Sequence, residues 1–150
     1  MSNFIGEIVD FPLGKLFPEI IQLHLDDLGT DFSWIKKNGR GSMIFFYGDF
    51  CSTCNTQIIE DISTRGYEIN IIFFNVTYSN ALTTPHKFNK ISSLGVSVYS
   101  INLEFLVSAL GISMVPSVIT IDSYGRIISG SIISNSRKVE KMAKKILKIL

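Results

Sequence analysis

Cys51 and Cys54 are the only cysteines in the 150-residue sequence, and two residues separate them. An apolar run over residues 43–47 precedes them and a stretch with helical periodicity follows, so we expect the pair at a strand-to-helix turn. The first turn of a helix offers unpaired backbone N–H groups and the positive end of the helix dipole, which stabilise a thiolate. This placement predicts dithiol chemistry with Cys51 as the nucleophile.

The second cysteine is expected on the buried face of the same helix. Cys54, Ile58 and Ile62 recur every four residues, which is the spacing of one helix face. Because residues three apart also share a face, the two thiols can form and open a disulfide without backbone movement. We therefore expect Cys51 to attack a substrate and Cys54 to release it.

Composition and charge exclude several classes of protein. The net charge is +1 and the basic residues concentrate in the last fifteen positions, so no basic stripe indicates a nucleic-acid partner. With 46% apolar residues the chain can bury a core, yet its longest apolar stretches fall far short of the ~20 residues of a membrane span. We expect no transmembrane segment. The N-terminus shows no signal-peptide pattern, which favours a cytoplasmic protein, or an extracytoplasmic one if an anchor was removed.

The first third of the chain predicts a lead-in, a strand and a helical turn. Residues 1–18 contain two prolines and predict an extended or turn-rich lead-in whose phenylalanines cover one edge of the core. Alternation over residues 19–26 predicts a half-buried strand with Leu25 on its apolar face. Residues 32–39 predict a short helical turn with Trp34 as a core anchor.

The middle of the chain predicts a βαβ unit and an insertion. The apolar runs at 43–47 and 69–76 indicate parallel strands covered on both faces, with the cysteine-bearing helix between them. Residues 77–101 form an inserted αβ segment, in which a helix begins at Thr84-Pro85 and a short strand follows.

The last third predicts a helix, a hairpin and a final helix. Residues 103–110 show helical periodicity with Val107 on the apolar face. Residues 117–121 and 126–133 predict the two strands of an antiparallel hairpin. Ser136 is expected to cap the final helix, which has an apolar side and several lysines around it.

The order of these elements resembles the thioredoxin superfamily. Two matches carry the resemblance: the CxxC motif behind a buried strand, and Val115-Pro116 about sixty residues later, just before another strand. The N-terminal extension and the αβ insertion are similar to TlpA/ResA-type thiol:disulfide oxidoreductases. The resemblance implies one thioredoxin-like α/β domain over residues 1–150, with a central mixed sheet flanked by helices. It also implies a cis peptide bond at Pro116 and a Val115 backbone that pairs with the substrate.

The sequence departs from this family around the motif. Phe50 stands where a tryptophan usually precedes the first cysteine, and Phe45 stands where thioredoxins carry a buried acid. The glutamate that ResA-like proteins place after the second cysteine is Gln57. No carboxylate is therefore assigned to deprotonate Cys54.

The residues and the resemblance together predict an enzyme, a thiol-disulfide oxidoreductase that exchanges disulfides with protein cysteines. We expect an upstream redox partner, and neither a cofactor nor a metal. The substrate-binding residues are expected to be Val115 and Pro116, with an apolar rim formed by Phe50 and Met114.

The alternative is a non-enzymatic protein of the same fold that binds a partner, or carries a metal through Cys51, Cys54 and His86. A zinc or copper site would need two more ligands than the cysteines provide, and the only histidines are His24 and His86. A peroxiredoxin is not expected, because Gly48 stands where its activating threonine would be.

Overall fold

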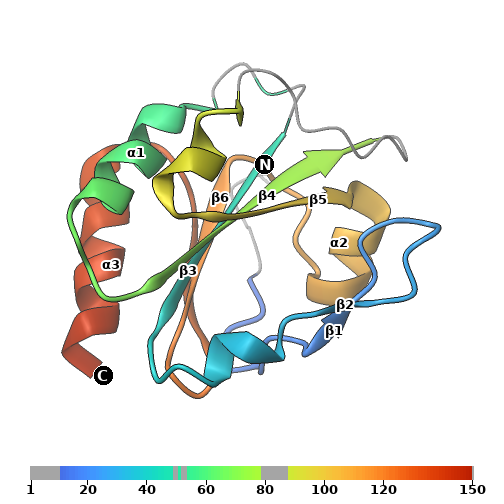
Figure 1. The fold of residues 1–150 in the computed structure, drawn as a ribbon, viewed down its shortest axis with the longest axis horizontal. Coiled ribbons are helices and arrows are strands. Elements are labelled where there is room, and N and C mark those ends of the chain that lie inside the picture. The colour runs from blue at the N-terminus through green and yellow to red at the C-terminus, as the bar shows by residue number, and fades with distance from the viewer. Residues whose placement is uncertain (1–10, 49–50, 52–53, 79–87, 150) are drawn as a thin grey trace, which may run out of the picture.

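A computed structural model describes residues 11–48, 51, 54–78 and 88–149. Its centre is a five-stranded mixed sheet with the strand order β5-β4-β3-β6-β7, beside a two-stranded ribbon, β1-β2 (Figure 1). The strands are β1 (Ile20–Ile21), β2 (Thr30–Asp31), β3 (Ser42–Gly48), β4 (Asn70–Thr77), β5 (Ser97–Asn102), β6 (Ser117–Ile121) and β7 (Ile127–Ile132). The helices are η2 (Ser33–Lys36), α1 (Thr56–Thr64), η4 (Ile91–Leu94), α2 (Leu103–Leu110) and α3 (Ser136–Ile149).

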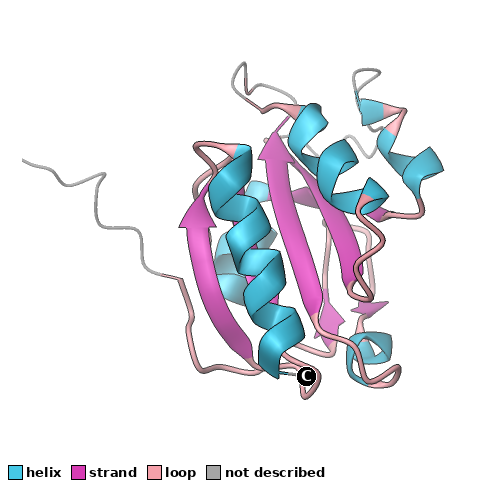
Figure 2. Ribbon diagram, turned by 90° about the vertical axis from the view of Figure 1, so that its left-hand side faces the viewer, coloured by secondary structure: helices cyan, strands magenta, loops and turns pink. Residues whose placement is uncertain are grey.

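Strand β3 is buried along its whole length because both faces of the sheet are covered. Helices α1 and α3 lie on one face, and α2, η2 and the β1-β2 ribbon lie on the other (Figures 1 and 2). We call the apolar cluster beneath α1 and α3 the α1–α3 core; it includes Phe45, Tyr47, Ile59 and Phe73. No helix in the described ranges is long and apolar enough to cross a bilayer.

The main strand predictions are confirmed. The apolar runs at 43–47 and 69–76 form β3 and β4, which pair in parallel, while β3 pairs antiparallel with β6 on its other side. The predicted hairpin joins β6 to β7 through a turn in which Gly125 has φ +88° and donates its N–H to the Asp122 carbonyl at 3.0 Å. Gly125 is used there because positive φ is costly for other residues.

The insertion is described only in part. The predicted helix start at Thr84-Pro85 lies outside the described residues. The following residues form η4, which ends at Gly95 with φ +79°, and the predicted strand is β5. Phe88 and Ile91 bury their side chains in the α1–α3 core.

The prediction of a strand over residues 19–26 is wrong beyond β1. Leu25 is 65% exposed instead of lying on a buried face. The chain leaves the strand because the Asp27 carboxylate accepts the N–H groups of Leu23 and Gly29, at 2.8 and 3.1 Å, and so forms a turn. Burial raises the pKa of Asp27, but these hydrogen bonds and one from Thr30 outweigh it and hold that pKa below its usual value.

Three further predictions about side chains and caps need correction. Trp34 is half-buried and packs only at the margin of the core, where Ile35 is fully buried. Val107 is 43% exposed because it lies beyond the face of α2 that packs on the sheet. The cap of α3 is Asn135, whose side chain accepts the N–H of Lys138 at 2.9 Å, so Ser136 is the first helical residue.

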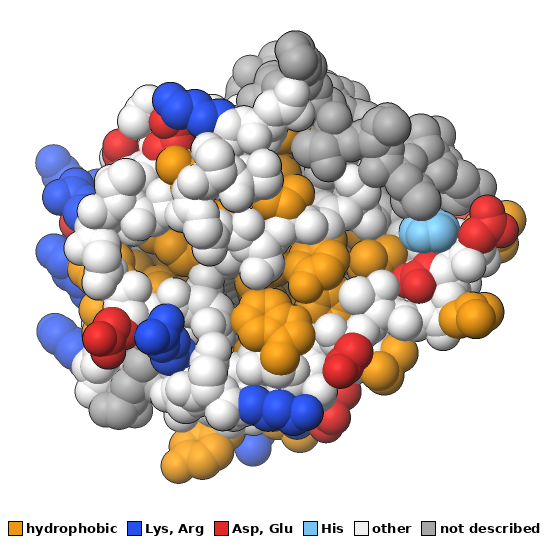
Figure 3. Space-filling view, viewed as in Figure 1, with side chains coloured by type: hydrophobic (Ala, Val, Ile, Leu, Met, Phe, Trp, Pro, Cys, Tyr) orange, Lys and Arg blue, Asp and Glu red, His pale blue; other side chains and the backbone are white. Residues whose placement is uncertain are grey.

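Helix α3 turns its apolar side to the sheet and its basic side outward. Lys and Arg side chains gather along the edge of the molecule on which α3 lies (Figure 3). Its one acidic residue, Glu140, is engaged by Arg65 and Tyr67 from the segment after α1. The basic surface is therefore not neutralised from within α3.

Candidate active site

The two cysteines form a disulfide immediately after β3. Their Cα atoms lie 5.5 Å apart, and both residues are half-buried. The Cys51 N–H donates to the Gly48 carbonyl at 3.2 Å, so the motif begins with a turn at the end of the strand. Cys54 packs against the α1–α3 core.

The prediction that the helix begins at Cys51 is wrong. Helix α1 begins at Thr56, and Asn55 is its cap: the Asn55 backbone is extended, and its side chain accepts the Gln57 N–H at 2.9 Å. Cys51 therefore precedes the first helical residue in the sequence instead of lying in the first turn of α1. Asparagine is a favoured cap residue, so Asn55 was a visible signal for the later start.

A buried tyrosine holds the chain that follows Cys54. The Tyr47 hydroxyl donates to the Asn55 carbonyl at 2.6 Å, and the tyrosine side chain is fully buried. Burial raises the pKa of Tyr47, so this hydroxyl stays protonated at neutral pH. Sequence reasoning treated Tyr47 only as part of an apolar strand, and nothing in the residue order indicated its partner.

The Val115-Pro116 element lies beside the end of β3. The β3–β6 register ends with Phe46 opposite Ser117, so the next positions along bring Pro116 beside Tyr47. The Val115–Pro116 peptide bond is cis, and the Pro116 carbonyl accepts the Ile133 N–H at 2.9 Å. Met114 is 41% exposed. Phe50 lies outside the described residues.

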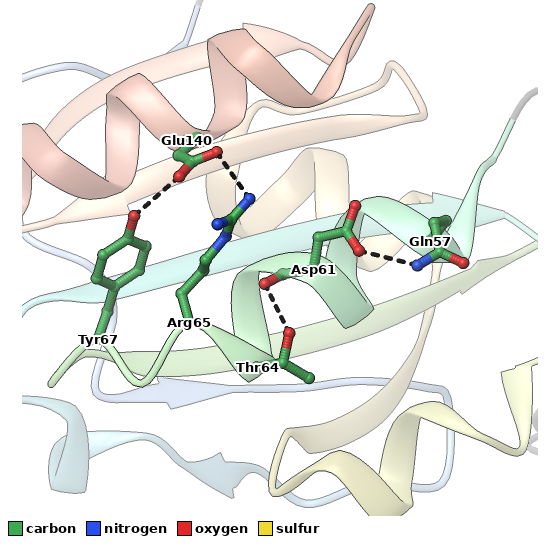
Figure 4. A network of polar contacts seen from close by, with 6 residues as sticks. All are labelled: Gln57, Asp61, Thr64, Arg65, Tyr67 and Glu140. Atoms are coloured by element: carbon green, nitrogen blue, oxygen red, sulfur yellow. Dashed lines mark hydrogen bonds and ion pairs between the residues drawn. The ribbon is translucent and has the colours of Figure 1, made fainter.

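The positions where thioredoxins and ResA-like proteins carry acids are occupied here by Phe45 and Gln57. Phe45 is fully buried in the α1–α3 core. Gln57 donates its side-chain N–H to the Asp61 carboxylate at 2.8 Å, and a separate pair of contacts joins Arg65 and Tyr67 to Glu140 (Figure 4). The first carboxylate after Cys54 in the sequence is Glu60, and it forms an ion pair with Lys90 at 2.9 Å. None of these contacts links a carboxylate to the cysteines.

The residues of the metal-carrying alternative are only partly described. His24 lies in the turn after β1, where its Nδ1 accepts the Asp26 N–H at 3.3 Å. His86 lies outside the described residues. Within the ranges that are described, no three His, Cys, Asp or Glu side chains come together as a metal-binding group.

Sequence reasoning also missed buried polar atoms in the sheet, on β4 and β5. Asn75 of β4 is fully buried, and its register partners are Tyr47 on β3 and Ser100 on β5. Neither atom of the Asn75 amide, nor the Ser100 hydroxyl, has a hydrogen-bond partner within the described part of the chain. The asparagine interrupts an apolar run, which is the signal that could have marked it.

No protein-family model matches this sequence, and a search of curated proteins found no match. Solved structures do match. A candidate protein disulfide isomerase from Bacteroides thetaiotaomicron has a TM-score of 0.63 and 17% identity, over 95% of this chain and 93% of that chain.

Two further matches are named for thiol chemistry. A thiol:disulfide interchange protein from Bacteroides sp. has a TM-score of 0.60 and 16% identity, over 88% of this chain and 90% of that chain. The thioredoxin domain of a thiol-disulfide oxidoreductase from Bacteroides vulgatus has a TM-score of 0.55 and 16% identity, over 89% of this chain and 99% of that chain. At these identities the likeness is one of fold.

Proposed function

Because the chain has a thioredoxin fold and carries a disulfide-bonded CxxC pair at the end of β3, we propose that it is a thiol-disulfide oxidoreductase acting on protein cysteines. The observation that carries the proposal is the Cys51–Cys54 disulfide itself, in a half-buried turn where solvent can reach it. A structural disulfide within the core would give no access to a partner.

Cys51 acts first in the reducing direction. Its thiolate attacks one sulfur of a substrate disulfide; the bond from Cys51 to that sulfur forms as the substrate S–S bond breaks, and the other sulfur leaves as a thiolate. Cys54 then attacks the Cys51 sulfur and releases the second substrate thiolate. The leaving thiolates take up the protons that the two cysteines lost, and two electrons have passed to the substrate. The reverse sequence oxidises a substrate dithiol.

An upstream redox partner completes the cycle. After one turnover the pair is in the opposite oxidation state, so a second protein or small thiol must restore it. The chemistry requires no cofactor, because the electrons reside in the two sulfur atoms.

Substrate docking is assigned to Val115 and Pro116, with an apolar rim of Met114 and Phe50. The β3–β6 register supports this, because it sets the Val115-Pro116 element beside the strand end that leads to Cys51. A backbone edge next to the nucleophile can pair with an extended substrate segment and hold its sulfur in line. The exposed Met114 side chain favours apolar residues near the substrate cysteine.

The proposed exchange is tested by single cysteine variants. The Cys54→Ser protein should accumulate mixed disulfides with an oxidised protein substrate such as insulin, and dithiothreitol should release them. The Cys51→Ser protein should form none, since its remaining thiol, Cys54, packs against the α1–α3 core and has the resolving role. Equal trapping by both variants, or by neither, would contradict the assignment of roles.

The docking role is tested with Met114→Ser. Exchange with a protein disulfide should slow severalfold, whereas exchange with oxidised glutathione should not change. Val107→Ser is the matched control, because Val107 is exposed to a similar degree, 43% against 41%, but lies on α2. If Val107→Ser slows exchange with the protein disulfide as much as Met114→Ser does, the docking role assigned to Met114 is wrong.

A further inference from the structure

We infer that Tyr47 is a positioning residue for the resolving step: its hydroxyl keeps Cys54 within reach of Cys51 after the disulfide has opened. The inference rests on the proposed function, because it concerns the second of the two exchange reactions. Tyr47 acts through the backbone that follows Cys54.

The backbone beside Cys54 is held from two sides. The Tyr47 hydroxyl donates to the Asn55 carbonyl at 2.6 Å, which ties this residue to the sheet. The Asn55 side chain accepts the Gln57 N–H at 2.9 Å, which ties the same residue to α1. Asn55 follows Cys54 directly in the chain, so the two contacts together restrict where the Cys54 backbone can lie.

Neighbouring residues of β3 hold both ends of the motif. The Gly48 carbonyl accepts the Cys51 N–H at 3.2 Å, and Tyr47, one residue earlier, holds Asn55. Both cysteines are therefore positioned relative to the same strand. Their Cα separation of 5.5 Å lies within the range from which a disulfide can close.

Tyr47 itself is firmly placed. Its ring lies edge-on to Phe73 and Phe88, with centroids 5.5 and 6.2 Å away, and its side chain is fully buried. Burial raises the pKa of Tyr47, so the hydroxyl remains a hydrogen-bond donor and is not a base for Cys54 at neutral pH. Its contribution is therefore positional.

The hydrogen bond matters most while the disulfide is open. In the oxidised form the covalent bond already holds the two sulfurs together. In the mixed disulfide only non-covalent contacts keep Cys54 near Cys51, and such restriction raises its effective concentration. The net worth of one neutral hydrogen bond corresponds to about a threefold to tenfold change in that concentration.

The test separates the two exchange steps with oxidised glutathione as the substrate. Attack by Cys51 is measured in the Cys54→Ser background, where resolution cannot occur. Release of glutathione is measured in the two-cysteine protein. Tyr47→Phe removes only the hydroxyl, and Tyr99→Phe is the matched control: its ring lies 5.4 Å from Phe74 on the other face of the sheet.

We expect Tyr47→Phe to leave the rate of attack unchanged and to slow glutathione release about threefold to tenfold. The reduction potential should become less negative, by about 30 mV if the effect is tenfold. An unchanged attack rate also shows that the Cys51 turn is intact in the variant.

Three outcomes would overturn the inference: unchanged release, equal slowing of both steps, or the same slowing in Tyr99→Phe. In each of these outcomes the wild-type protein still exchanges disulfides, so the proposed function is not contradicted. A wild-type protein that exchanges no disulfide would instead contradict the proposed function, and the positioning role with it.

Discussion

Replacing Asn75 with leucine should stabilise the protein. Asn75 is 0% exposed in the interior of β4, and its side-chain oxygen and nitrogen have no hydrogen-bond partner in the described ranges. Folding removes both atoms from water without replacing their hydrogen bonds. Leucine has the same branching at Cγ and carries no polar atom, so Asn75→Leu removes this cost.

The magnitude follows from two opposing effects. Each buried donor or acceptor left without a partner costs about 1–3 kcal/mol, and Asn75 carries one of each. The methyl groups of leucine are larger than the amide atoms, and overpacking in a dense core costs about 1–3 kcal/mol. The expected net gain is about 2 kcal/mol in the free energy of unfolding. For a chain of this size that corresponds to a melting temperature higher by about 4–8 °C.

Urea unfolding of the oxidised protein measures the change, and Asn70→Leu is the matched control on the same strand. The Asn70 side chain exchanges hydrogen bonds with Asn38, at 2.8 and 3.3 Å, and donates to Ser42 at 3.0 Å. Its replacement should therefore destabilise the protein by about 1 kcal/mol.

A loss of stability in both variants would contradict this explanation. If Asn75→Leu lowers the urea midpoint of unfolding as Asn70→Leu does, the Asn75 amide has hydrogen-bond partners in the folded protein and its burial carries no desolvation cost. A stabilised variant with slower disulfide exchange would further indicate that Asn75 is kept for its place beside Tyr47.

Three other predictions concern the packing of α3, the cap of α1 and the turn after β1. Gly41→Ala should destabilise the protein by about 1–3 kcal/mol in urea unfolding, because a Cβ atom there would clash with Ile146 of α3; a neutral result would mean that α3 moves freely. Asn55→Ala should cost about 1 kcal/mol by removing the α1 cap, measured the same way, and no loss would contradict the capping contact. The lowered pKa of Asp27 contributes stability above the usual aspartate pKa of about 3.9, which is lost as pH falls through the folded-state value. Thermal melts from pH 6 to about 2.5 should therefore show a smaller fall in melting temperature for Asp27→Asn than for wild type. Parallel curves for the two proteins would contradict a stabilising role for the Asp27 carboxylate.

The sheet and the thiol pair could be predicted because their signals are local. Apolar runs marked β3 and β4, and Gly125 marked the hairpin turn, since positive φ restricts the choice of residue. The CxxC spacing likewise identified Cys51 and Cys54 without any structure. These signals depend only on residues close together in the sequence that favour the same local conformation.

The remaining features depend on contacts that periodicity does not encode. The helical pattern through Cys54 suggested a longer α1. The Asn55 side chain instead accepts the Gln57 N–H and caps the helix, which begins at Thr56. Alternation extended β1 through Leu25, yet one carboxylate turned the chain earlier. The hydroxyl contact of Tyr47 joins a strand to a loop eight residues away, and only the folded geometry brings them together.

The reduction potential of the Cys51–Cys54 pair decides whether this disulfide is redox-active or structural. Equilibration with glutathione buffers, followed by trapping of free thiols, gives the fraction oxidised at each potential. A thiol-disulfide oxidoreductase predicts one reversible two-electron transition between about −120 and −270 mV, the range of proteins that exchange disulfides. A value below about −300 mV, typical of structural disulfides, or a pair that does not re-form its disulfide, would contradict the account.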